Sequence, residues 1–160
     1  MLQYMKRFTI AGGGTLLLAL AALTACRTAD TPKINMTSEP STVLFMCPYG
    51  GAKSVIATTY FNQLAERAGL PYRAAAVAAE TPYDAVPENV AAFLSNEGFD
   101  VRTFKPRHVA DTDLDSAAKV VSIDCDLTKL DTNGVTIERW DDVPKVSVDL
   151  PASAAALKPR

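Results

Sequence analysis

A short segment early in the chain constrains the fold more than any other, because residues 43–54 read VLFMCPYGGAKS. Four apolar residues are followed by a cysteine and two adjacent glycines, and then by a lysine and a serine that open an amphipathic run. This order predicts a buried strand, a tight loop and the start of a helix. The main-chain N–H groups of such a loop and the positive end of the helix together suit a tetrahedral oxyanion such as phosphate, arsenate or sulfate.

Cys47 ends the predicted strand and lies close in sequence to Lys53 and to the expected helix N-terminus. These positive groups favour a thiolate, so we predict a reactive nucleophile; the alternative is an inert thiol buried at a strand end. Lys53 also has an alternative, a solvated first-turn lysine, but a cation opposes the helix dipole there unless an anion is close. The residues expected to surround the oxyanion are Pro48, Tyr49, Gly50, Gly51, Ala52 and Lys53.

The N-terminal segment has the pattern of a secretory signal over residues 1–25, in which two basic residues precede an apolar stretch. The tetrapeptide LTAC, which ends at Cys26, resembles the bacterial lipobox, whose cysteine becomes the lipidated first residue. The alternative is an uncleaved transmembrane anchor. Residues 26–40 are polar and contain two prolines, as expected of a flexible tether. We therefore predict an exported, membrane-anchored lipoprotein of the cell envelope, with one domain over residues 41–160.

Charge and composition exclude several classes of partner. The formal net charge of −2 is nearly balanced, which argues against binding to nucleic acid. The single histidine, His108, falls in an expected loop and no histidine cluster is present, so the sequence predicts no metal site. If Cys26 carries lipid, Cys47 and Cys125 remain in an oxidising compartment. They form either a structural disulfide or a reactive thiol with a redox partner, and the sequence leaves both open.

Apolar periodicity predicts alternating strands and helices along the domain. Strands are expected at 42–46, 72–78, 119–123 and 135–140, and helices at 53–68, 87–97, 111–118 and 148–157. This alternation favours right-handed crossovers and a three-layer α/β architecture. Ligands of such sheets bind at the carboxyl ends of the strands, where Cys47 and Cys125 both fall.

The spacing C-x5-K-S from Cys47 to Ser54 directly follows an apolar strand. With the later strand VVSIDCDL and the WDDVP of residues 140–144, it resembles the low-molecular-weight protein tyrosine phosphatases and the related thioredoxin- or mycothiol-linked arsenate reductases. Their signature is C-x5-R-S after VLFVC, and the resemblance covers residues 42 to about 150. It implies a flavodoxin-like three-layer α/β/α domain around a four-stranded parallel sheet.

The resemblance implies a role for each residue of the motif. Cys47 attacks phosphorus or arsenic, Lys53 holds the oxyanion, Ser54 stabilises the thiolate, and Asp142 protonates the leaving group, with Asp141 as the alternative acid. The chain departs from the family where Lys53 replaces arginine, because lysine lacks the planar fork that grips two oxygens. It also departs at Gly50, where the phosphatases have an asparagine.

Three functions are consistent with this resemblance. The first is hydrolysis of phosphate monoesters, phosphotyrosine among them, through a cysteine thiophosphate and without a cofactor. The second is thiol-dependent arsenate reduction, with Cys125 as the redox partner and an external thiol reductant, although the third cysteine of the thioredoxin-linked enzymes is missing. The third is a non-catalytic module that binds an oxyanion or a phosphorylated protein.

Overall fold

The structure, a computed structural model, describes residues 39–132 and 134–158. The predicted signal peptide, Cys26 and most of the tether lie outside these residues. The described chain contains strands β1 (Ser41–Cys47), β2 (Tyr72–Ala78), β3 (Lys119–Ser122) and β4 (Ile137–Arg139), helices α1 (Lys53–Arg67), α2 (Glu88–Asn96), α3 (Asp111–Ser116) and α4 (Leu150–Leu157), and a 3-10 turn, η1 (Leu127–Lys129). None of these helices has the length and apolar character needed to cross a membrane.

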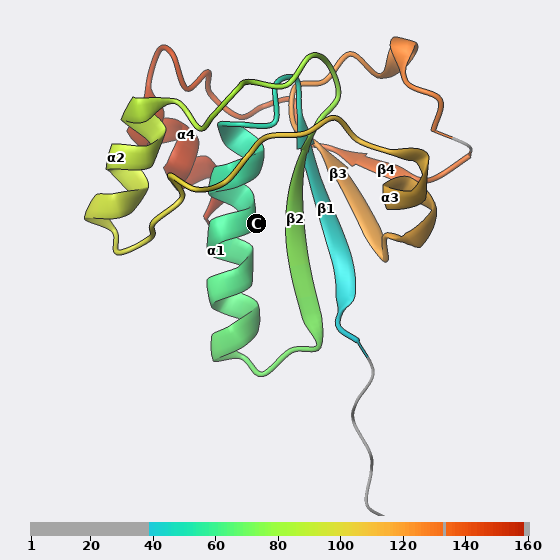
Figure 1. Cartoon of the computed structure of the whole chain (residues 1–160), viewed down its shortest axis with the longest axis horizontal. Helices are drawn as coiled ribbons and strands as arrows, with labels where there is room; N and C mark the ends of the chain where they lie inside the picture. Colours follow the sequence, from blue (N-terminus) through green and yellow to red (C-terminus); the bar gives the residue numbers. More distant parts are fainter. Residues whose placement is uncertain (1–38, 133, 159–160) are drawn as a thin grey trace, which may run out of the picture. The chain divides into compact units, whose positions relative to one another are not determined.

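The four strands form one sheet in the order β2-β1-β3-β4, and every neighbouring pair is parallel (Figure 1). The predicted four-stranded parallel sheet is therefore confirmed. In the register, Met46 of β1 pairs with Val77 of β2 and with Ser122 of β3. The carboxyl ends of the three strands consequently lie side by side, and Cys47 is the last residue of the central one.

Helices cover both faces of the sheet. Alternate strand residues point to opposite faces, so Phe45 and Val121 pack with α1, α2 and α4, whereas Leu44 and Val120 pack with Leu114 of α3. Figure 1 shows α3 on the opposite side of the sheet from α1. This arrangement confirms the three-layer α/β/α prediction, although the second helical layer is a single short helix.

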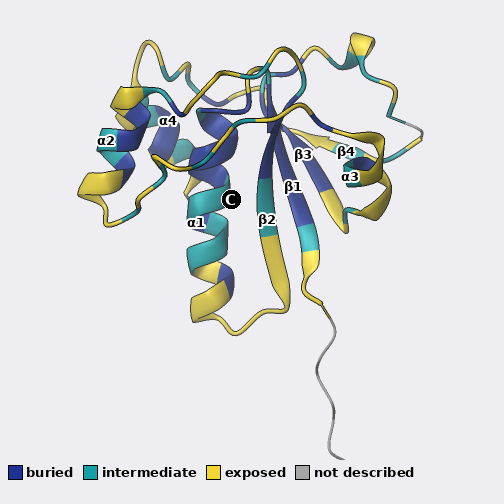
Figure 2. Cartoon of the chain, viewed as in Figure 1, coloured by how far each residue is buried: buried dark blue, intermediate teal, exposed yellow. Residues whose placement is uncertain are grey.

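Burial increases along the strands toward their carboxyl ends. β1 begins exposed at Ser41 and is fully buried over its last five residues, and β2 and β3 follow the same trend. Figure 2 shows this change from yellow to dark blue along the sheet. The edge on which Cys47 lies is therefore the buried edge, where electrostatic interactions are stronger than at an open surface.

Several predicted elements are shorter in the structure, among them α3 and β4. The helix expected to reach residue 118 stops at Ser116, since the amide of Ala118 donates a hydrogen bond to the Thr42 carbonyl of β1 (2.8 Å). The strand expected over residues 135–140 spans only Ile137–Arg139. Trp140 turns instead into the core, where its ring lies 5.6 Å from that of Phe45.

The last helix begins later than predicted. Residues 148–157 were expected to be helical, and α4 starts at Leu150. Asp149 ends the preceding loop because its carboxylate accepts a hydrogen bond from the amide of Ala152 (2.9 Å), which is the geometry of an N-cap. Ser153 also donates from its hydroxyl to the carbonyl of Pro144 (2.6 Å). These bonds join α4 to the loop that follows β4.

Candidate active site

The loop between β1 and α1 is held by its carbonyl groups. The carbonyl oxygens of residues 47–49 accept hydrogen bonds from main-chain amides of residues 79–83, with N···O distances of 2.8 to 3.1 Å. In a trans peptide the C=O group and the following N–H group point in opposite directions, and the peptide bonds here are trans. The N–H groups of Tyr49 and Gly50 therefore point away from residues 79–83, which suits a nest for an anion, whereas Pro48 has no N–H group to offer.

Both glycines of the loop lie in close contact with neighbouring groups. Gly50 has a φ of +66°, and a Cβ atom there would lie 2.9 Å from the amide nitrogen of Ala78. A Cβ atom on Gly51 would lie 2.9 Å from a ring carbon of Tyr83. Gly50 lets the loop approach the end of β2, and Gly51 leaves room for an aromatic ring.

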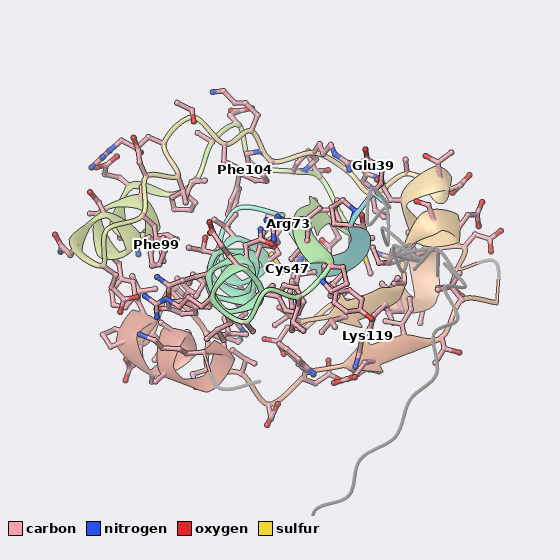
Figure 3. All side chains as sticks on the ribbon, turned by 90° about the horizontal axis from the view of Figure 1, so that it is seen from below. Glu39, Cys47, Arg73, Phe99, Phe104 and Lys119 are labelled. Atoms are coloured by element: carbon pink, nitrogen blue, oxygen red, sulfur yellow. The ribbon has the colours of Figure 1, made fainter. Side chains whose placement is uncertain are left out.

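Cys47 and Ser54 lie against each other at the base of this loop. The Cys47 sulfur is 3.1 Å from the Ser54 hydroxyl oxygen, and both residues are buried. The hydroxyl is therefore placed to donate to a thiolate, as the resemblance implied. Helix α1 begins at Lys53, so its positive end faces the same loop. Figure 3, which views the molecule from below, shows Cys47 near the centre, between α1 and the strands.

Lys53 has two partners from distant parts of the chain. Its ammonium group forms an ion pair with Asp124, which follows β3, and donates a hydrogen bond to the carbonyl of Val143 (2.8 Å), in the loop after β4. Lys53 is 7% exposed, so these contacts form with little competition from water. The cation beside the nucleophile thus connects three loops at the carboxyl edge of the sheet.

These residues open onto a cavity of about 490 Å³. Tyr49 and Tyr83 form one part of its wall, with stacked rings whose centroids are 4.9 Å apart. Ala52 also lines the cavity, whereas Gly50 and Gly51 are not among its lining residues. The full lining is Cys47, Pro48, Tyr49, Ala52, Lys53, Glu80, Tyr83, Pro87, Asn89, Asp124, Lys145, Val146 and Ser147.

The two candidate acids of the late loop do not line this cavity. Asp141 and Asp142 are exposed, and the carboxylate of Asp141 accepts a hydrogen bond from Arg139 (2.8 Å). The residue of this loop that reaches Lys53 is Val143. The acid role of Asp142 or Asp141 therefore stays a prediction without support from the geometry.

Sequence reasoning did not assign a role to Asp124, which lines the cavity and contacts Lys53. The signal that points to Asp124 is its position directly after a strand that ends at the same sheet edge as Cys47. Glu80, Tyr83 and Lys145 were missed as well, because their positions depend on how the loops after β2 and β4 fold over the edge.

Cys125 and Cys47 are both buried, but they lie in different surroundings. Both are free thiols, but Cys125 belongs to the core cluster on the α3 face and does not line the cavity. Its thiol donates a weak hydrogen bond to the Ile123 carbonyl (3.7 Å). Burial raises the pKa of Cys125 to about 11.

Within residues 39–132 and 134–158 there is no group of three histidine, cysteine or acidic side chains placed to hold a metal.

Comparison with known proteins identifies one family. Residues 42–134 match the family described as "Low molecular weight phosphotyrosine protein phosphatase". The matched segment begins in β1 and includes the cysteine loop, Asp124 and Cys125. It ends before the loop that contains Val143.

Individual relatives are distant. Over 97 residues the chain is 29% identical to a Halobacterium salinarum protein named "Putative arsenate reductase", covering 60% of this chain and 68% of that protein. A low molecular weight protein tyrosine phosphatase from T. tengcongensis has a similar structure, with a TM-score of 0.63 and 18% identity over 74% of this chain and 92% of that one. An arsenate reductase from Archaeoglobus fulgidus has a TM-score of 0.55 and 24% identity over 72% and 92%. The two solved structures confirm the predicted fold.

Proposed function

Because the chain belongs to the low molecular weight phosphotyrosine protein phosphatase family, we propose that it hydrolyses phosphate monoesters through a phosphorylated Cys47. The observation that carries this proposal is the placement of the Cys47 sulfur, 3.1 Å from the Ser54 hydroxyl in a loop whose amides suit an anion. A phosphoryl group bound there lies against the nucleophile, near the N-terminus of α1 and Lys53. The stacked Tyr49 and Tyr83 suit an aryl ester such as phosphotyrosine.

The test is release of nitrophenol from p-nitrophenyl phosphate by the full-length protein, with Cys47→Ser as the control. We expect turnover by the unaltered chain only, together with a phosphoryl group on the Cys47 peptide after rapid quenching. Hydrolysis that persists in Cys47→Ser would refute a cysteine mechanism. Binding of phosphate or vanadate without turnover, seen as a rise in melting temperature, would favour the non-catalytic module instead.

A second function, arsenate reduction, is favoured by the similarity to the Halobacterium salinarum protein. In this reaction Cys47 displaces water from arsenate, and a second thiol then attacks the Cys47 sulfur and releases arsenite. The two thiols supply the two electrons and end as a disulfide. The second thiol is either Cys125, whose burial would require movement, or an external thiol. Formation of arsenite with added glutathione or thioredoxin, and its absence in Cys47→Ser, tests this function.

Export and lipid anchoring are part of the same proposal and are supported only by the sequence of residues 1–26. The expected product is a mature protein that begins at a lipidated Cys26 in the cell envelope. Incorporation of radioactive palmitate in bacterial cells, lost in Cys26→Ser, tests the modification. An unlabelled protein that stays in the membrane fraction would instead indicate an uncleaved anchor.

A further inference from the structure

We propose that Asp124 is the acid–base residue of the cavity: it protonates the leaving group and then activates the water that hydrolyses phosphorylated Cys47. The proposal rests on the proposed phosphatase function and deepens it. It assigns to the segment after β3 the acid role that the family resemblance implied for the loop after β4.

The first observation is what the two segments present to the cavity. The loop after β4 brings a main-chain carbonyl, that of Val143, to Lys53, while Asp141 and Asp142 are exposed outside the cavity lining. Asp124 supplies a carboxyl group that lines the cavity and contacts Lys53. Its side chain is 30% exposed, so both substrate and water have access to it.

The second observation is the backbone of Asp124. Its φ of 56° makes it the only non-glycine residue with a positive φ among the described residues. This conformation costs about 1 kcal/mol, although aspartate tolerates it better than most residues. Strained backbone conformations of this kind are common at active sites and ligand-binding sites, where the surrounding structure keeps the residue in place. The amide of Ile123 fixes the approach to Asp124 by donating to the Met46 carbonyl of β1 (2.8 Å), one residue before the nucleophile.

A bound phosphate ester changes the contacts and charges around Asp124. In the empty site Lys53 compensates its carboxylate. A phosphate ester dianion attracts the Lys53 ammonium and repels the carboxylate, and the Cys47 thiolate adds to that repulsion. Two further charged groups line the cavity, Glu80, which adds negative charge, and Lys145, which offsets it. A bound ester therefore competes with Asp124 for Lys53 and frees the carboxyl group to exchange a proton with the substrate.

Two balanced steps follow. In the first, the Cys47 thiolate forms a bond to phosphorus, the bond to the leaving oxygen breaks, and the proton of Asp124 moves to that oxygen. In the second, the Asp124 carboxylate takes a proton from water, the water oxygen bonds to phosphorus, and the sulfur–phosphorus bond breaks. Inorganic phosphate leaves, and the thiolate and the protonated carboxyl group are restored.

The test compares two substrates that differ in how much the leaving group needs a proton, phenyl phosphate and p-nitrophenyl phosphate. For Asp124→Asn we expect kcat/KM to fall about 100-fold on phenyl phosphate and less than 10-fold on p-nitrophenyl phosphate, because nitrophenolate leaves without protonation. Loss of the base also slows the second step, so we expect a burst of nitrophenol and accumulated phosphocysteine. Asp115→Asn, at an exposed position of α3 that does not line the cavity, is the matched control and should alter neither substrate by more than about 2-fold.

A second variant separates catalysis from folding. Asp124→Gly removes the carboxyl group and relieves the positive φ, so it should remain folded and show the same dependence on the leaving group. An equal loss on both substrates would mean that Asp124 only positions Lys53 and would overturn the proposal. A loss confined to phenyl phosphate in Asp142→Asn would also overturn it. Turnover of neither substrate by the unaltered chain would instead refute the phosphatase function itself.

Discussion

The loop after β1 and the loop after β4 meet at the same cavity, but they are built in different ways. The first, residues 47–53, is held by main-chain hydrogen bonds to residues 79–83 and presents a thiol and its own amides. The second, residues 140–149, is tied to α4 through Ser153 and Asp149, and the part of it that reaches Lys53 is the Val143 carbonyl. Backbone geometry therefore determines the first loop, whereas side-chain anchors far along the chain determine the second.

The difference between the two loops shows when a sequence motif predicts which groups face the cavity. A loop whose function lies in its own amides keeps that function if its glycines and its ends are present. In the second loop, which side chain or carbonyl faces the cavity depends on the exact position of each residue along the loop. Residue 143, directly before Pro144, contacts Lys53 and is valine, whereas the neighbouring aspartates are exposed.

The largest expected effect is in the first loop. Cys47→Ser should lower kcat/KM for p-nitrophenyl phosphate by about 10⁴-fold or more, because a serine hydroxyl is not ionised as a thiolate is. Cys125→Ser is the matched control, since Cys125 does not line the cavity, and it should retain most of the activity. Equal losses in the two variants would indicate a structural effect rather than a missing nucleophile.

A loss of about 10²- to 10³-fold is expected for Lys53→Met, because the cation that stabilises the oxyanion is removed together with the contacts to Asp124 and Val143. Lys53→Arg keeps the charge and should recover most of that loss. Steady-state kinetics of both variants measure the contrast. If Lys53→Met is as active as the unaltered chain, the contacts of Lys53 with Asp124 and Val143 do not contribute to turnover.

The two thiols should differ in reactivity by at least about 10-fold, because only Cys47 lies in the activating loop. Burial raises the pKa of Cys125 to about 11. Its thiol therefore stays almost entirely neutral between pH 7 and pH 9, and at pH 9 only about one molecule in a hundred carries the thiolate. Iodoacetamide should therefore label Cys47 throughout this range, and phosphate should protect it. Peptide mass spectrometry measures both sites; faster labelling of Cys125 would contradict the assignment.

Gly50→Ala should destabilise the fold by about 1–3 kcal/mol, because alanine is strained at a φ of +66° and its Cβ would contact the Ala78 amide. Gly134→Ala is the matched control: its φ of +77° carries the same backbone cost, but nothing lies within 4 Å of the added atom. The difference between the two in urea denaturation isolates the contact. Equal values would mean that the loop after β1 does not need its close approach to β2.

The smallest effect is expected in the second loop. Asp141→Asn weakens a surface contact with Arg139 (2.8 Å) and should change the free energy of unfolding by less than about 0.5 kcal/mol. Because Asp141 does not line the cavity, its loss should leave kcat/KM within about 2-fold. A tenfold fall in kcat/KM would instead indicate that the loop after β4 supplies the acid, so that both loops would contribute side chains to catalysis.

Most of the fold was predictable from periodicity. β2 has the predicted bounds, and β1 and α1 begin or end within one residue of them. The errors lie where a tertiary contact ends an element, as at Ala118, which bonds to β1, and at Trp140, which packs against Phe45. The cysteine-dependent enzyme family was also predictable from the C-x5-K-S loop, and the family match confirms it.

The sequence by itself determined the parallel α/β sheet and the thiol loop, because strand and helix periodicity and the close sequence spacing of Cys47, Gly50 and Ser54 act over a few residues. Only the tertiary structure decided which distant groups complete the cavity. Lys53 meets Asp124 across 71 positions and Val143 across 90, and the order of the strands and the packing of α4 bring those groups together. Contacts over such separations depend on the whole core, so no local pattern records them.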